Sequence, residues 1–129
     1  MEEKYKLLGG DFSLPMFITK VNNIFVMYYT AIMMDDEKRV AHFLSDEVYE
    51  ELKERIAKLN AANEREMFDE LNVKTTEISD IIDADDEYII KVTLISRYMD
   101  YVIDKTTFKY KRGVNDRRIE KTNYLELHK

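Results

Sequence analysis

The hydrophobic pattern near the amino terminus predicts one long helix from Ser13 to Met34. Apolar residues recur there at helical spacing, and toward the end of the segment they spread round most of the helix. Its start is marked too, because Ser13 can cap the free amides and Pro15 suits a first turn. Phe12 can pack on Phe17 just inside the helix. Such a helix must be covered on nearly every side, so we expect it in the core.

The apolar part of this segment is too short to predict a membrane span. It covers only Ile24 to Met34, whereas a bilayer needs roughly 20 residues. Lys20, Asn22 and Asn23 lie in the preceding half of the helix. We therefore interpret the segment as a buried helix of a soluble domain, and a helix that lies in a membrane interface is the alternative.

Two further helical stretches follow. After a polar turn at 35–39, a short helix can turn three apolar residues inward, namely Val40, Phe43 and Leu44. Ser45 then resembles a second cap, because a stripe at helical spacing follows it, made of Val48, Leu52, Ile56 and Leu59. This helix is amphipathic and should lie on the outside of the core. It should end near 60–63 and lead into a connecting loop over 63–67.

From residue 68 onward the pattern changes from helical spacing to alternation, which predicts strands. The first strand covers residues 68–82, with a bulge within 73–78. A turn at 83–86 leads to the strongest strand signal, from Tyr88 to Ile103, where β-branched and aromatic residues dominate. The two strands should pair as an antiparallel hairpin.

A brief strand over 108–110, a loop over 114–118 and a final strand over 119–127 complete the pattern. Helices followed by meandering strands are typical of an α+β domain with helices packed on one face of an antiparallel sheet. A long, bulged sheet should curl, so we expect the first helix in its concavity. A length of 129 residues fits a single domain over 1–129, with 1–12 as a flexible lead-in.

The composition excludes some classes of site and partner. The chain has no cysteine, so neither a disulfide framework nor a thiolate metal site is possible. A formal net charge of -6 argues against a general nucleic-acid binder. The amino terminus is acidic and polar, unlike a secretory signal, so we expect a cytoplasmic protein.

Two stretches carry a resemblance to a known family. One is the phrase D-x-x-R-V-x-x-F-L-S-D-E-V-Y-E-E over 36–51, and the other is the predicted hairpin over 73–103. In order and spacing they resemble the Tim-like domain family, which comprises the carboxy-terminal domain of the mitochondrial inner-membrane translocase subunit 44 and its bacterial relatives. The last strand departs from the family, which usually has a tryptophan or phenylalanine near a terminal arginine; here it carries Tyr124, Leu125 and Leu127.

The resemblance implies a cone-shaped fold of the nuclear-transport-factor-two or cystatin type, in which a curved sheet wraps a long helix around an apolar pocket. It also implies a non-enzymatic role, with attachment to a protein or an acidic phospholipid surface at the inner face of a membrane. An apolar small molecule could occupy the pocket. We predict that its lining is Phe17, Val21, Phe25, Tyr28, Ile32, Ile90, Val92, Leu94, Tyr98 and Asp100.

Asp100 is the best candidate for catalysis. In alternation with Ser96 and Tyr98 it could face the concave side, where other members of this fold use a carboxylate for proton transfer. A small-molecule enzyme or ligand-binding protein with Asp100 in the pocket is therefore the alternative function. The plainer interpretation is a carboxylate near a strand end that pairs with a basic neighbour such as Arg97, and we expect no enzyme activity.

We predict neither a metal site nor a cofactor. His42 and His128 are far apart in sequence, and His42 with Asp46 makes only a two-ligand site across a helix break. A partly buried structural histidine is the more common case. Ser45 is explained as a helix cap rather than as a nucleophile.

Basic residues gather late in an otherwise acidic chain. The candidates for binding a partner or lipid are Lys109, Lys111, Arg112, Arg117 and Arg118. Each basic side chain near an anionic bilayer can contribute about 1 kcal/mol, so several could dock the domain weakly. The alternative is a solvated loop whose charges keep an edge strand from aggregating. We expect a monomer or homodimer that attaches peripherally at the inner face of the membrane.

Overall fold

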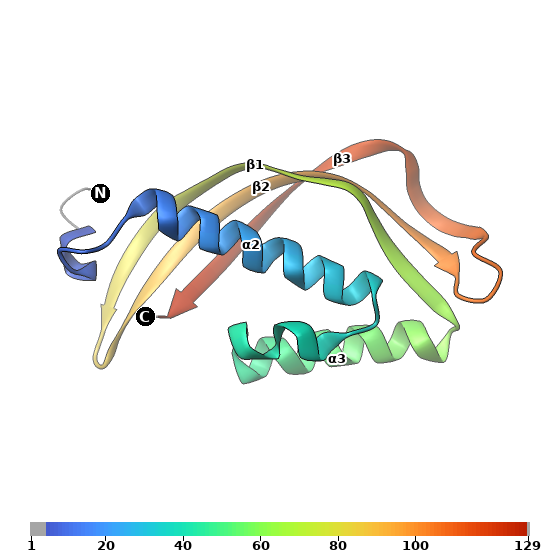
Figure 1. Cartoon of the computed structure of the whole chain (residues 1–129), viewed down its shortest axis with the longest axis horizontal. Helices are drawn as coiled ribbons and strands as arrows, with labels where there is room; N and C mark the ends of the chain where they lie inside the picture. Colours follow the sequence, from blue (N-terminus) through green and yellow to red (C-terminus); the bar gives the residue numbers. More distant parts are fainter. Residues whose placement is uncertain (1–4, 129) are drawn as a thin grey trace.

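A computed structural model describes residues 5–128. A 3-10 turn η1 (Lys6–Leu8) precedes the long helix α2 (Leu14–Met33), a 3-10 helix η2 (Glu37–Phe43) and the helix α3 (Asp46–Ala61). Strands β1 (Glu64–Ala84), β2 (Glu87–Asp104) and β3 (Tyr110–His128) follow. Helices α2 and α3 lie on the same side of an arched sheet (Figure 1), so the predicted α+β architecture is confirmed.

Both long helices begin at the predicted caps. Ser13 Oγ accepts a hydrogen bond from the Met16 amide at 3.4 Å, and Ser45 Oγ accepts one from the Val48 amide at 3.2 Å. Each bond satisfies an amide that has no partner within its helix. A cap of this kind contributes about 1 kcal/mol, so these two serines fix where α2 and α3 start.

Residues 5–12 of the predicted lead-in pack on the core. Leu8 is only 4% exposed. The ring of Phe12 contacts those of Tyr5 and Phe17, at centroid distances of 6.0 and 5.7 Å. The apolar contacts of this segment extend the core beyond the start of α2. Residues 1–4 of the lead-in lie outside the described residues.

The sheet is an antiparallel meander in the order β1-β2-β3. Asp85 and Asp86 form the turn between β1 and β2. The pairing of β1 with β2 shifts register at 69–72, 73–75 and 78–80, and one of these shifts lies within the predicted bulge at 73–78. Bulges bend a strand and increase its twist, so they let the sheet arch over α2 (Figure 1).

Several predicted strand boundaries are wrong. The loop predicted over 63–67 is mostly the start of β1, because residues 64–67 pair with 101–104 of β2. The loop predicted over 114–118 belongs to β3, and the brief strand predicted over 108–110 contributes only its last residue. Tyr98 pairs with Ile119, and Asp100 pairs with Val114. Residues 115–118 therefore form a bulge opposite Met99. Residues on both sides of this polar bulge pair with β2, so β3 continues through it.

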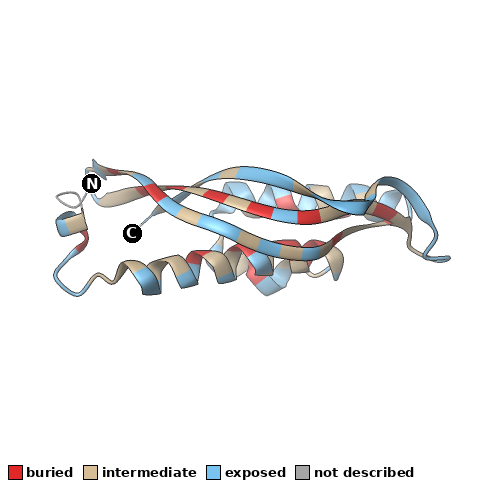
Figure 2. Ribbon diagram, turned by 90° about the horizontal axis from the view of Figure 1, so that it is seen from above, coloured by how far each residue is buried: buried red, intermediate tan, exposed pale blue. Residues whose placement is uncertain are grey.

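The core lies between α2 and the concave face of the sheet, as expected. Strand β2 turns alternate side chains toward α2, and the buried ones are Ile90, Val92, Leu94, Ser96, Tyr98 and Val102. Helix α2 meets them with Val21, Phe25, Tyr29, Ala31 and Ile32. Figure 2 marks buried positions in red along the strands and on the helix turns beneath them.

Helix α2 is less completely covered than its sequence predicts. Met16 in its first turn is 75% exposed and Met34 at its carboxyl end is 54% exposed, because one side of the helix packs on the sheet and η2 and α3 cover only part of the other. In η2, Val40 is buried as expected, whereas Phe43 is exposed rather than turned inward. The molecule therefore has two layers, and its longest helix has an outer face.

Candidate functional site

A cavity opens between α2, the start of α3 and the end of β3. Its volume is about 470 Å³, within the range of roughly 300–1,000 Å³ typical of small-molecule sites. The apolar and aromatic lining includes Val21, Ile24, Phe25, Tyr28 and Tyr29 of α2, Val48 of α3, and Leu125 and Leu127 of β3. Helix α2 packs mainly on β1, and no residue of β3 is fully buried, so the space beneath β3 remains open.

The cavity contains part of the predicted pocket. Val21, Phe25 and Tyr28 line it. The residues that lie elsewhere are Phe17 and Ile32 on α2 and Ile90, Val92, Leu94, Tyr98 and Asp100 on β2. Most of these side chains pack in the core between α2 and the concave face of the sheet, so the open space lies to one side of them.

Most of the lining residues that the sequence did not predict come from β3 and α3, and the others include Ile24 and Tyr29 of α2 and Phe43 of η2. Leu125 and Leu127 share the alternation phase of Ile119, a signal that is visible in the sequence. Arg55 follows Leu52 by one helical turn, so helical spacing could have placed it near the inner side of α3. Its charge instead suggests a solvent-facing position.

Arg55 joins the cavity to two carboxyl groups on the sheet. Its Nε and Nη2 donate to Glu66 Oε1 at 3.1 and 2.9 Å, and its Cζ lies 5.5 Å from the centre of the Phe68 ring. Glu66 shares a hydrogen bond with Asp100, and burial together with this bond raises the pKa of Asp100 to about 7. Two carboxyls this close resist ionising together, so the pair retains a proton up to nearly neutral pH.

Asp100 meets one requirement of the alternative function but not the other. Its pKa is raised, yet it is not among the residues that line the cavity. A general base must come within hydrogen-bond reach of its substrate. The predicted partner Arg97 lies elsewhere, with its Nε 3.3 Å from Glu120 Oε1. Asp100 is therefore hydrogen-bonded to Glu66 and retains a proton there, and it is not placed to act as a general base in the cavity.

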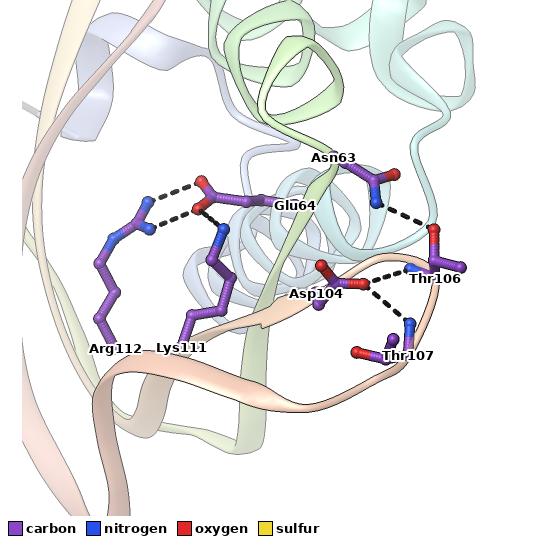
Figure 3. A network of polar contacts seen from close by, with 7 residues as sticks. All are labelled: Asn63, Glu64, Asp104, Thr106, Thr107, Lys111 and Arg112. Atoms are coloured by element: carbon purple, nitrogen blue, oxygen red, sulfur yellow. Dashed lines mark hydrogen bonds and ion pairs between the residues drawn. The ribbon is translucent and has the colours of Figure 1, made fainter.

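Lys111 and Arg112 already have an anionic partner in the fold. Arg112 Nη1 lies 2.6 Å from Glu64 Oε2, and Lys111 Nζ lies 2.8 Å from the same oxygen (Figure 3). The hydrogen bonds from Arg112 and Lys111 lower the pKa of Glu64 to about 2. Nearby, Asp104 Oδ1 accepts hydrogen bonds from the amides that begin the β2–β3 connection (Figure 3). This network ties the start of β3 to the start of β1.

We expect Glu64→Gln to lower the melting temperature at neutral pH and to flatten its fall in acid. The pKa of Glu64 is depressed from 4.5 to about 2, so its ion pairs stabilise the fold above pH 4.5 and are lost as the pH falls toward 2. Thermal unfolding of both proteins across that range measures the effect. Melting curves that stay a constant distance apart at every pH would contradict this role.

All five side chains of the predicted basic site are exposed, but Lys109, Arg117 and Arg118 are the ones that do not pair with Glu64. Lys109 lies in the connection before β3, and the two arginines lie on the bulge at 115–118. Arg117 Nη1 pairs only weakly, 3.2 Å from Oδ1 of the adjacent Asp116, and both side chains are largely exposed. These three cations therefore remain accessible to a partner.

The histidines do not form a shared site. His128 Nδ1 lies 2.7 Å from Glu87 Oε1, and the ring of His42 contacts Phe43. Among residues 5–128, no group of three or more His, Cys, Asp or Glu side chains is placed to hold a metal ion. None of the described helices has the length and apolar character needed to cross a bilayer.

The family model of the Tim44-like domain matches residues 3–127. The chain belongs to the Tim44-like domain family. A comparison with curated proteins found no match. Membership of the Tim44-like family supports, in general terms, a membrane-associated module of the translocase type. Tim44-like domains are generally non-catalytic.

Proposed function

We propose that this Tim44-like domain is a non-catalytic binding module that holds a protein or acidic lipid partner peripherally at the inner face of a membrane. The observation that carries the proposal is the family match over residues 3–127. Two structural features support it, the cavity beneath β3 and the exposed cations at 109 and 117–118. The cavity would hold an apolar group of the partner, and the cations would make the first contact.

The exposed cations suit a weak, salt-sensitive contact with an anionic surface. At about 1 kcal/mol each, Lys109, Arg117 and Arg118 together would contribute about 3 kcal/mol, or roughly a hundredfold in affinity. Phe108 and Tyr110 flank Lys109 and are 64% and 50% exposed. Aromatic rings of this kind favour the membrane interface. Because salt screens exposed charges, the contact should weaken as ionic strength rises.

Vesicle flotation tests the lipid version of this proposal. The domain should float with vesicles that contain phosphatidylglycerol at low salt, and much less with vesicles of phosphatidylcholine alone. We expect the variant K109E/R117E/R118E to lose roughly a hundredfold or more in vesicle affinity, because each substitution replaces an attractive charge by a repulsive one. Circular dichroism should show that its fold is unchanged, since all three side chains are exposed.

The matched control is K20E/K38E/K53E, which makes the same change in net charge on α2, η2 and α3. It should keep most of the vesicle affinity, because these side chains lie on the helices and not on β3 or the connection before it. Equal losses in both variants would show that net charge alone drives binding. A wild-type domain that ignores anionic vesicles at low salt would exclude the lipid partner.

A further inference from the structure

Among the described residues that line the cavity, Arg55 is the one cation. Its side chain is 38% exposed, and its hydrogen bonds to Glu66 use Nε and Nη2. The Nη1 group is left with N–H donors that make no described hydrogen bond. An acidic group in the cavity could therefore bind Arg55 without first breaking the ion pair with Glu66.

The remaining charges at the cavity favour a ligand whose acidic head lies inward. Glu47 and Glu126 also line the cavity, but both are exposed, so they would repel an anion at the rim. Most of the remaining lining is apolar and aromatic, and it includes Val21, Phe25 and Leu125. A hydrocarbon chain suits these walls, and its acidic end suits Arg55.

Titratable or charged groups from every neighbouring element face Asp100. They are Glu66 from β1, Arg55 from α3, Lys121 from β3 and Tyr98 from its own strand β2. Tyr29 from α2 is hydrogen-bonded to Tyr98. Burial is the main cause of the raised pKa of Asp100, and Glu66 is the next, whereas Arg55 opposes both. An anion bound to Arg55 would offset the positive charge that lowers the pKa of Asp100, so the pKa of the carboxyl pair would rise.

From this geometry we infer that the cavity binds an apolar molecule with a single carboxylate head, held by Arg55, and that the Glu66–Asp100 pair couples this binding to proton uptake. The inference rests on the proposed function, because it uses the cavity as the ligand site. It adds the class of ligand and the residue that anchors it. The two carboxyls act through Arg55 and do not touch the ligand, so they are positioning residues.

Proton linkage gives this binding a defined pH dependence. Below the pKa of the pair, near 7, its proton is already in place and binding is independent of pH. Above that value the free protein has lost the proton, so binding of the anion is accompanied by uptake of a proton from the solvent. Affinity for the carboxylate should therefore fall as the pH rises above neutral, by up to about tenfold per pH unit.

Calorimetric titration with octanoate, octanol and octylamine tests the inference. All three carry the same hydrocarbon chain, and octanoate stays ionised at both about pH 6 and about pH 8.5. At the lower pH we expect octanoate to bind about tenfold more tightly than octanol, as a charge-assisted hydrogen bond allows, and octylamine to bind most weakly. At the higher pH, the measured binding enthalpy should differ between two buffers of different ionisation enthalpy, because the proton that the protein takes up comes from the buffer.

Three variants separate the roles of the residues. Arg55→Met should make octanoate and octanol bind equally, with binding of octanol retained. Asp100→Asn should keep the preference for octanoate and remove its pH dependence. Arg39→Met is the matched control, because Arg39 lies on η2, pairs with Asp36 and does not line the cavity. If Arg55→Met fails to fold, proton uptake by the wild-type protein still tests the linkage.

The outcomes distinguish this inference from the proposed function. Equal binding of octanoate and octanol, tighter binding of octylamine, or an octanoate affinity that does not change with pH would overturn the inference and leave the apolar cavity as a ligand site. Binding of none of the three would overturn the inference and also remove the cavity from the proposed function. Vesicle flotation through Lys109, Arg117 and Arg118 is independent of all these results.

Discussion

Gly113→Ala should destabilise the protein by about 2–4 kcal/mol, because both the backbone angle and the space at this position require glycine. Gly113 has a φ of 103°, which side chains rarely adopt. An added Cβ would lie 2.5 Å from the Asp100 carbonyl oxygen and 2.6 Å from Tyr101 Cα, so β3 would have to move away from β2. Urea unfolding followed by circular dichroism measures the free energy of unfolding.

Gly10→Ala is the matched control for this prediction. No heavy atom lies within 4 Å of a Cβ built on Gly10, and its φ is outside the left-handed region. We expect a change within about 0.5 kcal/mol, as is usual for a surface substitution. Equal free energies of unfolding for the two variants would show that β3 does not approach β2 closely at Gly113.

Leu52→Ala should cost about 2–5 kcal/mol, the usual range for a leucine truncated in a closed core. Leu52 is 0% exposed and is one of the largest fully buried side chains. Alanine is the better helix former, so α3 itself would not be weakened and the loss would come from packing. The free energy of unfolding from urea denaturation is the measurement.

Leu7→Ala provides the comparison, because Leu7 is 41% exposed. We expect it to cost well under about 1 kcal/mol, since little apolar surface is lost from the core. A cost for Leu52→Ala that is no larger than this would mean that α3 is not packed beneath the sheet. That result would remove one wall of the cavity as well.

The spacing of apolar residues predicted the helices and the hairpin well. The caps at Ser13 and Ser45 and the alternation over 88–103 are local signals, and each depends on residues close together in the chain. The strand over 64–67 and the continuity of β3 could not be predicted this way. Those segments are polar. Residues 64–67 are extended because they pair with β2, and β3 continues past 115–118 because the residues on both sides of that bulge pair with β2.

The candidate site was predicted less completely than the fold. Val21, Phe25 and Tyr28 were expected at the pocket and line the cavity, because the apolar face of α2 is visible in its period. Arg55 and Leu125 were missed, since whether they reach a cavity depends on where α3 and β3 lie. The basic residues were recognised from composition, but the carboxylate that pairs with Lys111 and Arg112 is distant in sequence.

The sequence by itself determined the order and type of most elements, the cap of each long helix, the apolar stripe of α2 and the family. These follow from interactions within a turn of helix or between alternate residues of a strand. Only the tertiary structure decided that the open space lies beneath β3, that Glu64 pairs with two of the cations, and that Arg55 links the cavity to Glu66 and Asp100. Burial and charge pairing between distant segments exist only once the sheet has curved over its helices.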